Sequence, residues 1–313
     1  MGVMVGTGLL VAACAWDPYT GPEATLAARV QSLHVKGHRA LDRGERGRAR
    51  AIFEEARLLA ESLDDLPGMT QVLNDLGAVT ALEGRASEAV QLHQQALAIA
   101  ESLNRADLVV DTMTHLGTAL QLAGQPDQAS SFYAKGLALA RKTGNRQSEA
   151  VLLNNIGLLE KQAGRPKEAE DSFRAALAIN KELDNRPAQA ANLANLGLIA
   201  EAAGNFDVAY DHFQRALELD KAVENRSAIA ADLSGLARVA EAQHRQDEAL
   251  GYAQRSYWSY RALGDLPRAK TELTRALALA KAQGDKDAVL QLETELKLWP
   301  SADASDKPKP DKR

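Results

Sequence analysis

The sequence is poor in cysteine and in aromatic residues, and it contains no long apolar run. Its single cysteine cannot build a disulfide framework or a cysteine-based zinc site. Aromatic residues make up only 4% of the chain. This argues against β-sandwiches and β-barrels, because their strands favour aromatic and β-branched side chains. No apolar stretch reaches the roughly 18 residues of a membrane-spanning helix.

The residues that are abundant indicate a helical protein without a nucleic-acid surface. The net charge is −5, and acidic and basic residues are interspersed, so no basic patch suited to nucleic acid is expected. Alanine and leucine supply most of the apolar residues, and both are strong helix formers. The 313 residues allow one large domain or two ordinary ones.

A repeat with a period of 40 residues runs through most of the chain. Two amphipathic stretches in each repeat, such as residues 150–163 and 167–182, flank a helix-stopping turn such as Gly164-Arg165-Pro166. The sequence therefore predicts consecutive hairpins of two helices. The recurring positions are an apolar–glycine pair at Leu76-Gly77, Leu116-Gly117, Ile156-Gly157 and Leu196-Gly197, and a small residue at Ala49, Ala89, Ala129, Ala169, Ala209 and Ala249.

The pattern Leu193, Leu196-Gly197, Ala209, Phe213 and Ala216 resembles the tetratricopeptide repeat family, in the class with a longer period. The resemblance covers about residues 26–299 and implies an all-α, right-handed superhelical solenoid of about seven antiparallel hairpins. Residues 267–299 are expected to form a capping hairpin. Small residues such as Ala176 are expected where helices cross closely, and Phe173 is expected to fill the gap between neighbouring repeats.

The resemblance also implies a concave groove, lined by one face of the first helix of each repeat. Asparagine offers both a donor and an acceptor, so a row of asparagines could bind the backbone of an extended peptide of any sequence. We expect Asn154, Asn155 and Asn195 to make such contacts, although the alternative is that they satisfy neighbouring helix ends. The candidate groove residues are Asn74, Asp75, Asp111, His115, Asn154, Asn155 and Asn195.

The two ends of the chain differ from the repeats. Residues 1–13 resemble a secretory signal, and Val11-Ala12-Ala13-Cys14 resembles the bacterial lipobox, which predicts lipid attachment at Cys14. Residues 14–25 would then form a tether. No Lys or Arg precedes Cys14, which departs from a normal signal peptide, and the alternative is a chance cysteine in a leader. Residues 300–313 are too polar to bury a core and are expected to be disordered.

Motifs for catalysis or cofactor binding are weak. Gly6-Thr7-Gly8 lacks the rest of a dinucleotide fingerprint. His34 and His38 have the spacing of two metal ligands on one helix face, but no patterned third ligand follows, so we interpret them as a solvated face without metal. The aromatic segment 252–260 is either a partner-binding surface or part of the core under the capping hairpin.

These features predict a scaffold or adaptor that binds a protein or peptide segment in its groove. The protein is expected to be no enzyme and to use no cofactor, nucleic acid or small-molecule substrate. A lipid on Cys14 would anchor it in a bacterial cell envelope, at the outer membrane facing the periplasm. The alternative is a cytoplasmic regulator or sensor domain of the same repeat family that binds a signalling peptide or protein.

Overall fold

The computed structural model describes residues 22–299, and within this range every element of regular secondary structure is an α-helix. The chain divides into two compact units, one ending at Asn145 and the other beginning at Arg146. The first unit contains α1 (Pro22–Asp42), α2 (Arg46–Ser62), α3 (Leu66–Leu82), α4 (Ala86–Ser102), α5 (Ala106–Leu122) and α6 (Pro126–Thr143). The second contains α7 (Arg146–Gln162), α8 (Pro166–Glu182), α9 (Arg186–Ala202), α10 (Phe206–Ala222), α11 (Arg226–Ala242), α12 (Gln246–Ala262), α13 (Leu266–Gln283) and α14 (Lys286–Lys297).

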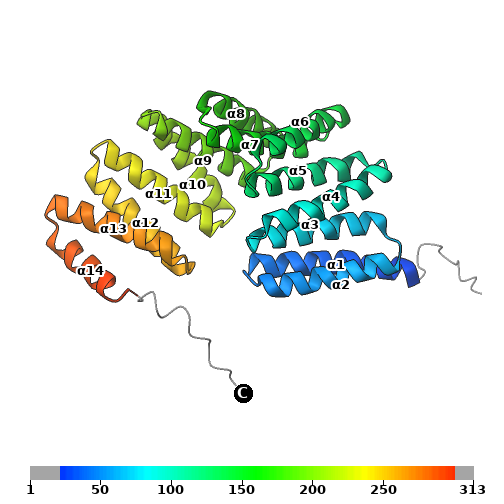
Figure 1. Cartoon of the computed structure of the whole chain (residues 1–313). Coiled ribbons are helices and arrows are strands. Elements are labelled where there is room, and N and C mark those ends of the chain that lie inside the picture. The colour runs from blue at the N-terminus through cyan, green and yellow to red at the C-terminus, as the bar shows by residue number, and fades with distance from the viewer. Residues whose placement is uncertain (1–21, 300–313) are drawn as a thin grey trace, which may run out of the picture. The chain divides into compact units, whose positions relative to one another are not determined.

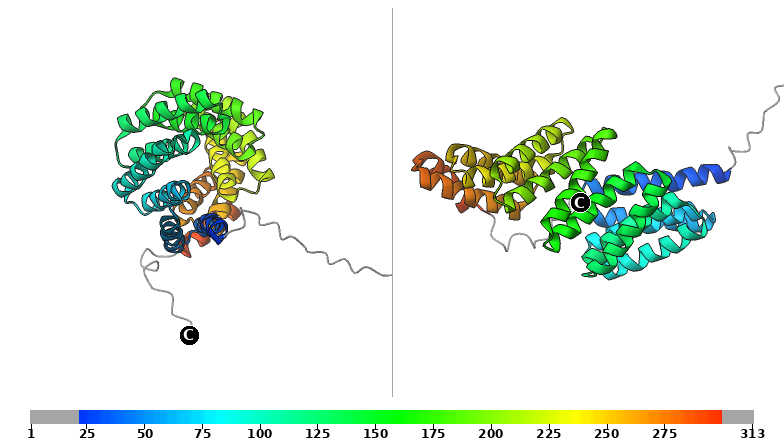
Figure 2. Two further views of the ribbon diagram at one scale, coloured as in Figure 1. Left: turned by 90° about the vertical axis from the view of Figure 1, so that its right-hand side faces the viewer. Right: turned by 90° about the horizontal axis from the view of Figure 1, so that it is seen from above.

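Within each unit the helices pack as consecutive hairpins. Each odd-numbered helix packs against the even-numbered helix that follows it, from α1 with α2 to α13 with α14 (Figure 1). Figure 2 draws the same helices from two further directions. One hairpin corresponds to one 40-residue repeat, so the predicted all-α hairpin architecture is confirmed.

Every turn between two successive helices contains one residue with a positive φ, in the left-handed region of backbone conformation. The turns therefore repeat as regularly as the helices. Between α7 and α8 this residue is Gly164, with φ of +71°, and between α8 and α9 it is Asp184, with φ of +48°. Glycine adopts this conformation without steric cost, and aspartate tolerates it better than most residues do. After the second turn, the Asn185 side chain caps α9 by accepting a hydrogen bond from the backbone N–H of Ala188.

The core is built from small residues and from aromatic rings that lie on glycines. Ala176 is fully buried, as predicted, and so are the alanines of the 40-residue register. A Cβ atom at Gly157 would lie 2.8 Å from the Phe173 ring, so the ring packs directly on the backbone of its own hairpin. Phe173 also shares a core cluster with Leu193 and Leu196 of the next hairpin. It therefore fills the expected gap between repeats and joins the two helices of its own hairpin as well.

The aromatic segment on α12 belongs mainly to the core. Tyr257 and Tyr260 are buried in a cluster that includes Leu273 and Leu277 of α13. Trp258 is instead 44% exposed. Of the two interpretations offered by the sequence, packing under the last hairpins therefore accounts for both buried tyrosines.

The ends of the chain lie outside the described residues. Cys14, the predicted signal segment and the predicted disordered tail all belong to residues 1–21 or 300–313. In residues 22–299, none of the helices combines the length and the apolar character that a bilayer crossing requires.

Candidate binding surfaces on the odd-numbered helices

The predicted asparagines of the second unit form a connected hydrogen-bond network. Asn154 on α7 is its centre, because its Oδ1 accepts hydrogen bonds from Nδ2 of Asn192 at 3.0 Å and from Nδ2 of Asn195 at 3.3 Å. Asn192 is buried, and its own Oδ1 accepts from Asn180 of α8 at 2.8 Å. Asn154 and Asn195 are half-buried. The network therefore links three successive helices and orients the amides at its edge.

Two atoms at that edge are available for a ligand. Asn154 Nδ2 donates a long hydrogen bond of 3.5 Å to Asn155 Oδ1. Within residues 22–299, Asn155 Nδ2 and Asn195 Oδ1 have no hydrogen-bond partner. Asn155 and Asn195 occupy the same position of consecutive repeats, and the partly buried Leu158 and Leu198 follow three residues after them. This surface can offer one donor, one acceptor and apolar contacts.

In the first unit, Asn74 is buried and both of its polar atoms are already used. Its Nδ2 donates to Thr112 Oγ1 at 2.9 Å, and its Oδ1 accepts from His93 Nδ1 at 3.0 Å. Burial is the largest influence on His93 and lowers its pKa to about 3, so this imidazole is neutral. Asn74 thus holds α3, α4 and α5 together, and its side chain has no free polar atom to present in a groove.

Asp75 joins the two histidines of α1 across neighbouring hairpins. Its Oδ2 lies 2.6 Å from His34 Nδ1, and its Oδ1 lies 2.9 Å from His38 Nε2. The sequence pattern showed no third ligand for the two histidines, whereas the structure supplies Asp75 from α3; His38 remains exposed, as interpreted, and His34 is half-buried. Burial opposes ionisation of Asp75, but the hydrogen bonds from both histidines outweigh it and lower the pKa of this carboxyl. The hydrogen bond to Asp75 raises the pKa of His38.

The remaining predicted residues of the first unit, Asp111 and His115, lie on α5 and are exposed. The His115 ring stacks on His93 with 5.6 Å between ring centroids and 10° between ring planes. Loss of solvent around the imidazole is the largest cause of the lowered pKa of His115. Four of the six histidines of the chain thus lie in two close pairs in the first unit. His34 and His38 of α1 meet at Asp75, and His93 of α4 stacks on His115 of α5.

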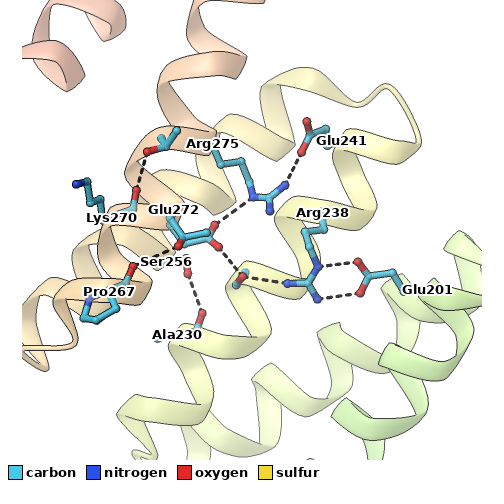
Figure 3. A network of polar contacts seen from close by, with 12 residues as sticks. Glu201, Ala230, Arg238, Glu241, Ser256, Pro267, Lys270, Glu272 and Arg275 are labelled. Carbon is cyan, nitrogen blue, oxygen red and sulfur yellow. Dashed lines mark hydrogen bonds and ion pairs between the residues drawn. The ribbon is translucent and has the colours of Figure 1, made fainter. Parts of the chain in front are cut away.

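Charged residues at the far end of the second unit neutralise each other. Arg238 forms a two-pronged ion pair with Glu201 and also donates to Ser234 Oγ at 3.1 Å (Figure 3). Arg275 binds Glu241 at 2.7 Å in the same network. The hydrogen bonds to Glu201 are the largest cause of the raised pKa of Arg238. These groups cross-link successive hairpins, so they are not free charges for a ligand.

Sequence reasoning missed a hydrogen bond that recurs between consecutive odd-numbered helices. It joins two residues that are 38 positions apart in the sequence. A pair of polar residues with this separation could have predicted it, because the repeat is 40 residues long. The three examples are Asn74 with Thr112, Asn154 with Asn192, and Ser234 with Glu272.

Comparison with known proteins agrees with this architecture. A tetratricopeptide repeat family model matches residues 31–102, 108–182 and 188–257. BtubC from P. vanneervenii is similar in structure, with a TM-score of 0.60 and 21% identity over 75% of this chain and 92% of that chain. A Rap protein complexed with Competence and Sporulation Factor gives a TM-score of 0.60 and 17% identity over 81% of this chain and 75% of that chain.

The pilF protein of Pseudomonas aeruginosa gives a TM-score of 0.55 and 20% identity over 75% of this chain and 91% of that chain. At such low identity these three likenesses concern the fold alone. A search of curated proteins found no match to the sequence.

Proposed function

Because the chain belongs to the tetratricopeptide repeat family, we propose that it is a scaffold that holds an extended protein or peptide segment against α7 and α9. The observation that carries this proposal is the half-buried edge of the asparagine network. There Asn155 and Asn195 each keep an unused polar atom, in the same position of consecutive repeats. A Rap protein of similar fold is known in complex with Competence and Sporulation Factor, which supports a bound factor as the kind of ligand.

The chemistry of the two free atoms suits a peptide backbone. Asn155 Nδ2 can donate to a backbone carbonyl, and Asn195 Oδ1 can accept from a backbone N–H. Neither contact depends on the ligand side chains, whereas the neighbouring Leu158 and Leu198 favour apolar ones. The ordered network behind the two amides reduces the side-chain entropy lost on binding.

The test compares wild type with an Asn155→Ala/Asn195→Ala variant. Each lost hydrogen bond is worth about 1 kcal/mol, so the double variant should bind the isolated partner segment about 30-fold more weakly if the losses add. Gln254→Ala on α12 is a matched control, because it removes an amide from a half-buried position outside this surface. Circular dichroism checks that all three proteins fold. Equal affinities in a titration by calorimetry would place the binding surface elsewhere.

We also propose that lipid on Cys14 anchors this scaffold in a bacterial cell envelope, at the outer membrane facing the periplasm. The support is the lipobox-like Val11-Ala12-Ala13-Cys14 together with the absence of any other cysteine. Several acyl chains hold a protein at a membrane firmly, whereas one chain does so only marginally. Wild type should therefore sediment with membranes and the Cys14→Ser variant should not.

The alternative is a cytoplasmic regulator that binds a signalling peptide or protein through the same surface. Identical soluble fractionation of wild type and Cys14→Ser would favour this alternative. It would leave the binding surface on α7 and α9 untouched, because that proposal is tested separately.

A further inference from the structure

Two histidines and one carboxylate converge between the first two hairpins of the chain. His34 and His38 are one helical turn apart on α1, and their ring centroids are 4.5 Å apart. Asp75 reaches them from α3, with one carboxylate oxygen directed at each imidazole. The three candidate ligand atoms all lie within 4.8 Å of one another.

We propose that His34, His38 and Asp75 form a binding site for a divalent transition-metal ion of the zinc type. Imidazole nitrogen and carboxylate oxygen are common zinc ligands, and three protein ligands leave a fourth position for water or another group. His34 presents Nδ1 and His38 presents Nε2, and the buried Asp75 side chain fixes the centre of the set between them.

The observed distances are compatible with this role. Tetrahedral zinc with bonds of about 2.0–2.2 Å places its ligand atoms about 3.3 Å apart. The two histidine–carboxylate contacts, at 2.6 and 2.9 Å, are shorter than that, whereas no pair of ligand atoms exceeds 4.8 Å. Small side-chain rotations would lengthen the two short histidine–carboxylate contacts and shorten any longer separation between ligand atoms. The hydrogens now shared with Asp75 would leave as the metal replaces them.

Access and surroundings also suit an ion. The His38 side chain is 47% exposed and that of His34 is 26% exposed, so the site opens to solvent, whereas only 9% of the Asp75 side chain is accessible. The Phe53 ring contacts His38 edge-on at 5.5 Å between centroids, which restrains the imidazole. A purely structural role, in which the histidines only cross-link α1 and α3, needs no such open side.

The experiment titrates Zn²⁺ and Mg²⁺ into the full chain by calorimetry, after removal of metal with a chelator and without an affinity tag. Every protein carries Cys14→Ser, so that a free thiol cannot contribute ligands, and the protein with this change alone is the reference called wild type here. Wild type should bind one Zn²⁺ per chain and no Mg²⁺. His38→Ala changes an exposed side chain and should weaken zinc binding at least about tenfold, because loss even of an outer-shell partner costs 10–100-fold. Binding of Co²⁺ should give a visible absorption band that this variant lacks.

Two other histidines provide the controls. His244→Asn alters an exposed turn residue of the other compact unit, between α11 and α12, and should leave the zinc affinity unchanged. His115→Gln tests the neighbouring stacked pair and should also leave it unchanged. The proposal is overturned if wild type binds zinc no better than a His34→Ala/His38→Ala variant of unchanged helicity. It is equally overturned if His115→Gln abolishes binding and His38→Ala does not.

Discussion

Asp232 on α11 lies against Asp220 on α10, and both carboxyl groups are buried. The preceding repeat places Asn192 against Asn180 at the same two positions, joined by a hydrogen bond of 2.8 Å. Two adjacent buried carboxyls cannot both ionise at little cost. Burial and the neighbouring Asp220 raise the pKa of Asp232 to about 8, so at neutral pH a proton remains between the two groups.

We therefore expect the stability of the second unit to depend on pH through this pair. The pKa of Asp232 is about 8 in the folded protein and about 3.9 in an unfolded chain. The folded state thus binds more protons, so stability falls as the pH rises from about 4 to about 8. Asp232→Asn places here the asparagine that the preceding repeat has, and it should remove this pH-dependent loss. Its free energy of unfolding, relative to that of wild type, should therefore increase by roughly 1–3 kcal/mol from pH 5 to pH 7.5.

The measurement is urea denaturation of both proteins at the two pH values. Asp171→Asn on α8 is the control, because this aspartate is exposed and its removal should change stability equally at both pH values. A wild type and an Asp232→Asn variant with parallel pH profiles would show that the buried pair does not hold a proton.

Ala176 tests the close packing of the helices. Its side chain is fully buried where small residues recur, so Ala176→Leu should destabilise the protein by roughly 1–3 kcal/mol through overpacking. Ala178→Leu lies two residues away on the same helix at an exposed position and should change stability by less than about 0.5 kcal/mol. Thermal denaturation compares the two, and equal melting temperatures would mean that position 176 does not face the core.

Two glycines in helices should respond to alanine with opposite signs. A Cβ atom at Gly117 would lie 2.3 Å from the Tyr133 ring, so Gly117→Ala should destabilise by at least about 1 kcal/mol. A Cβ atom at Gly251 meets nothing within 4 Å, so Gly251→Ala should stabilise by about 0.5–1 kcal/mol through helix propensity. Chemical denaturation measures both, and a stabilising Gly117→Ala would disprove the ring-on-backbone packing.

Replacement of Asn154 should affect stability, unlike replacement of Asn155. Asn154 accepts hydrogen bonds from Asn192 and Asn195, and Asn154→Ala would leave Nδ2 of the buried Asn192 without its partner. We expect it to cost roughly 1–3 kcal/mol of stability, whereas Asn155→Ala should cost less than about 0.5 kcal/mol because its amide is at the edge of the network. Denaturation of the two single variants separates the structural from the ligand-facing asparagine. Similar losses would mean that both are structural.

The helical hairpins were predictable because their signals are local and repeated. Gly164 and Pro166 end one helix and begin the next through backbone conformation alone. Small residues at the position of Ala176 and aromatic residues at the position of Phe173 recur with the 40-residue period, so the pattern predicted that both are buried. The asparagines at 154, 155 and 195 were found for the same reason, although the pattern could not say which of them is already bonded.

The sequence by itself determined the helices, their turns and the small-residue core, because each depends on residues within one repeat. Only the tertiary structure decided how polar side chains pair between repeats. It brings Asp75 onto His34 and His38, and it leaves Asp232 beside Asp220 where the preceding repeat has two amides. These pairings depend on how successive hairpins stack. His34 and His38 lie about 40 residues before Asp75, whereas Asp220 and Asp232 are 12 residues apart on two helices that belong to successive hairpins.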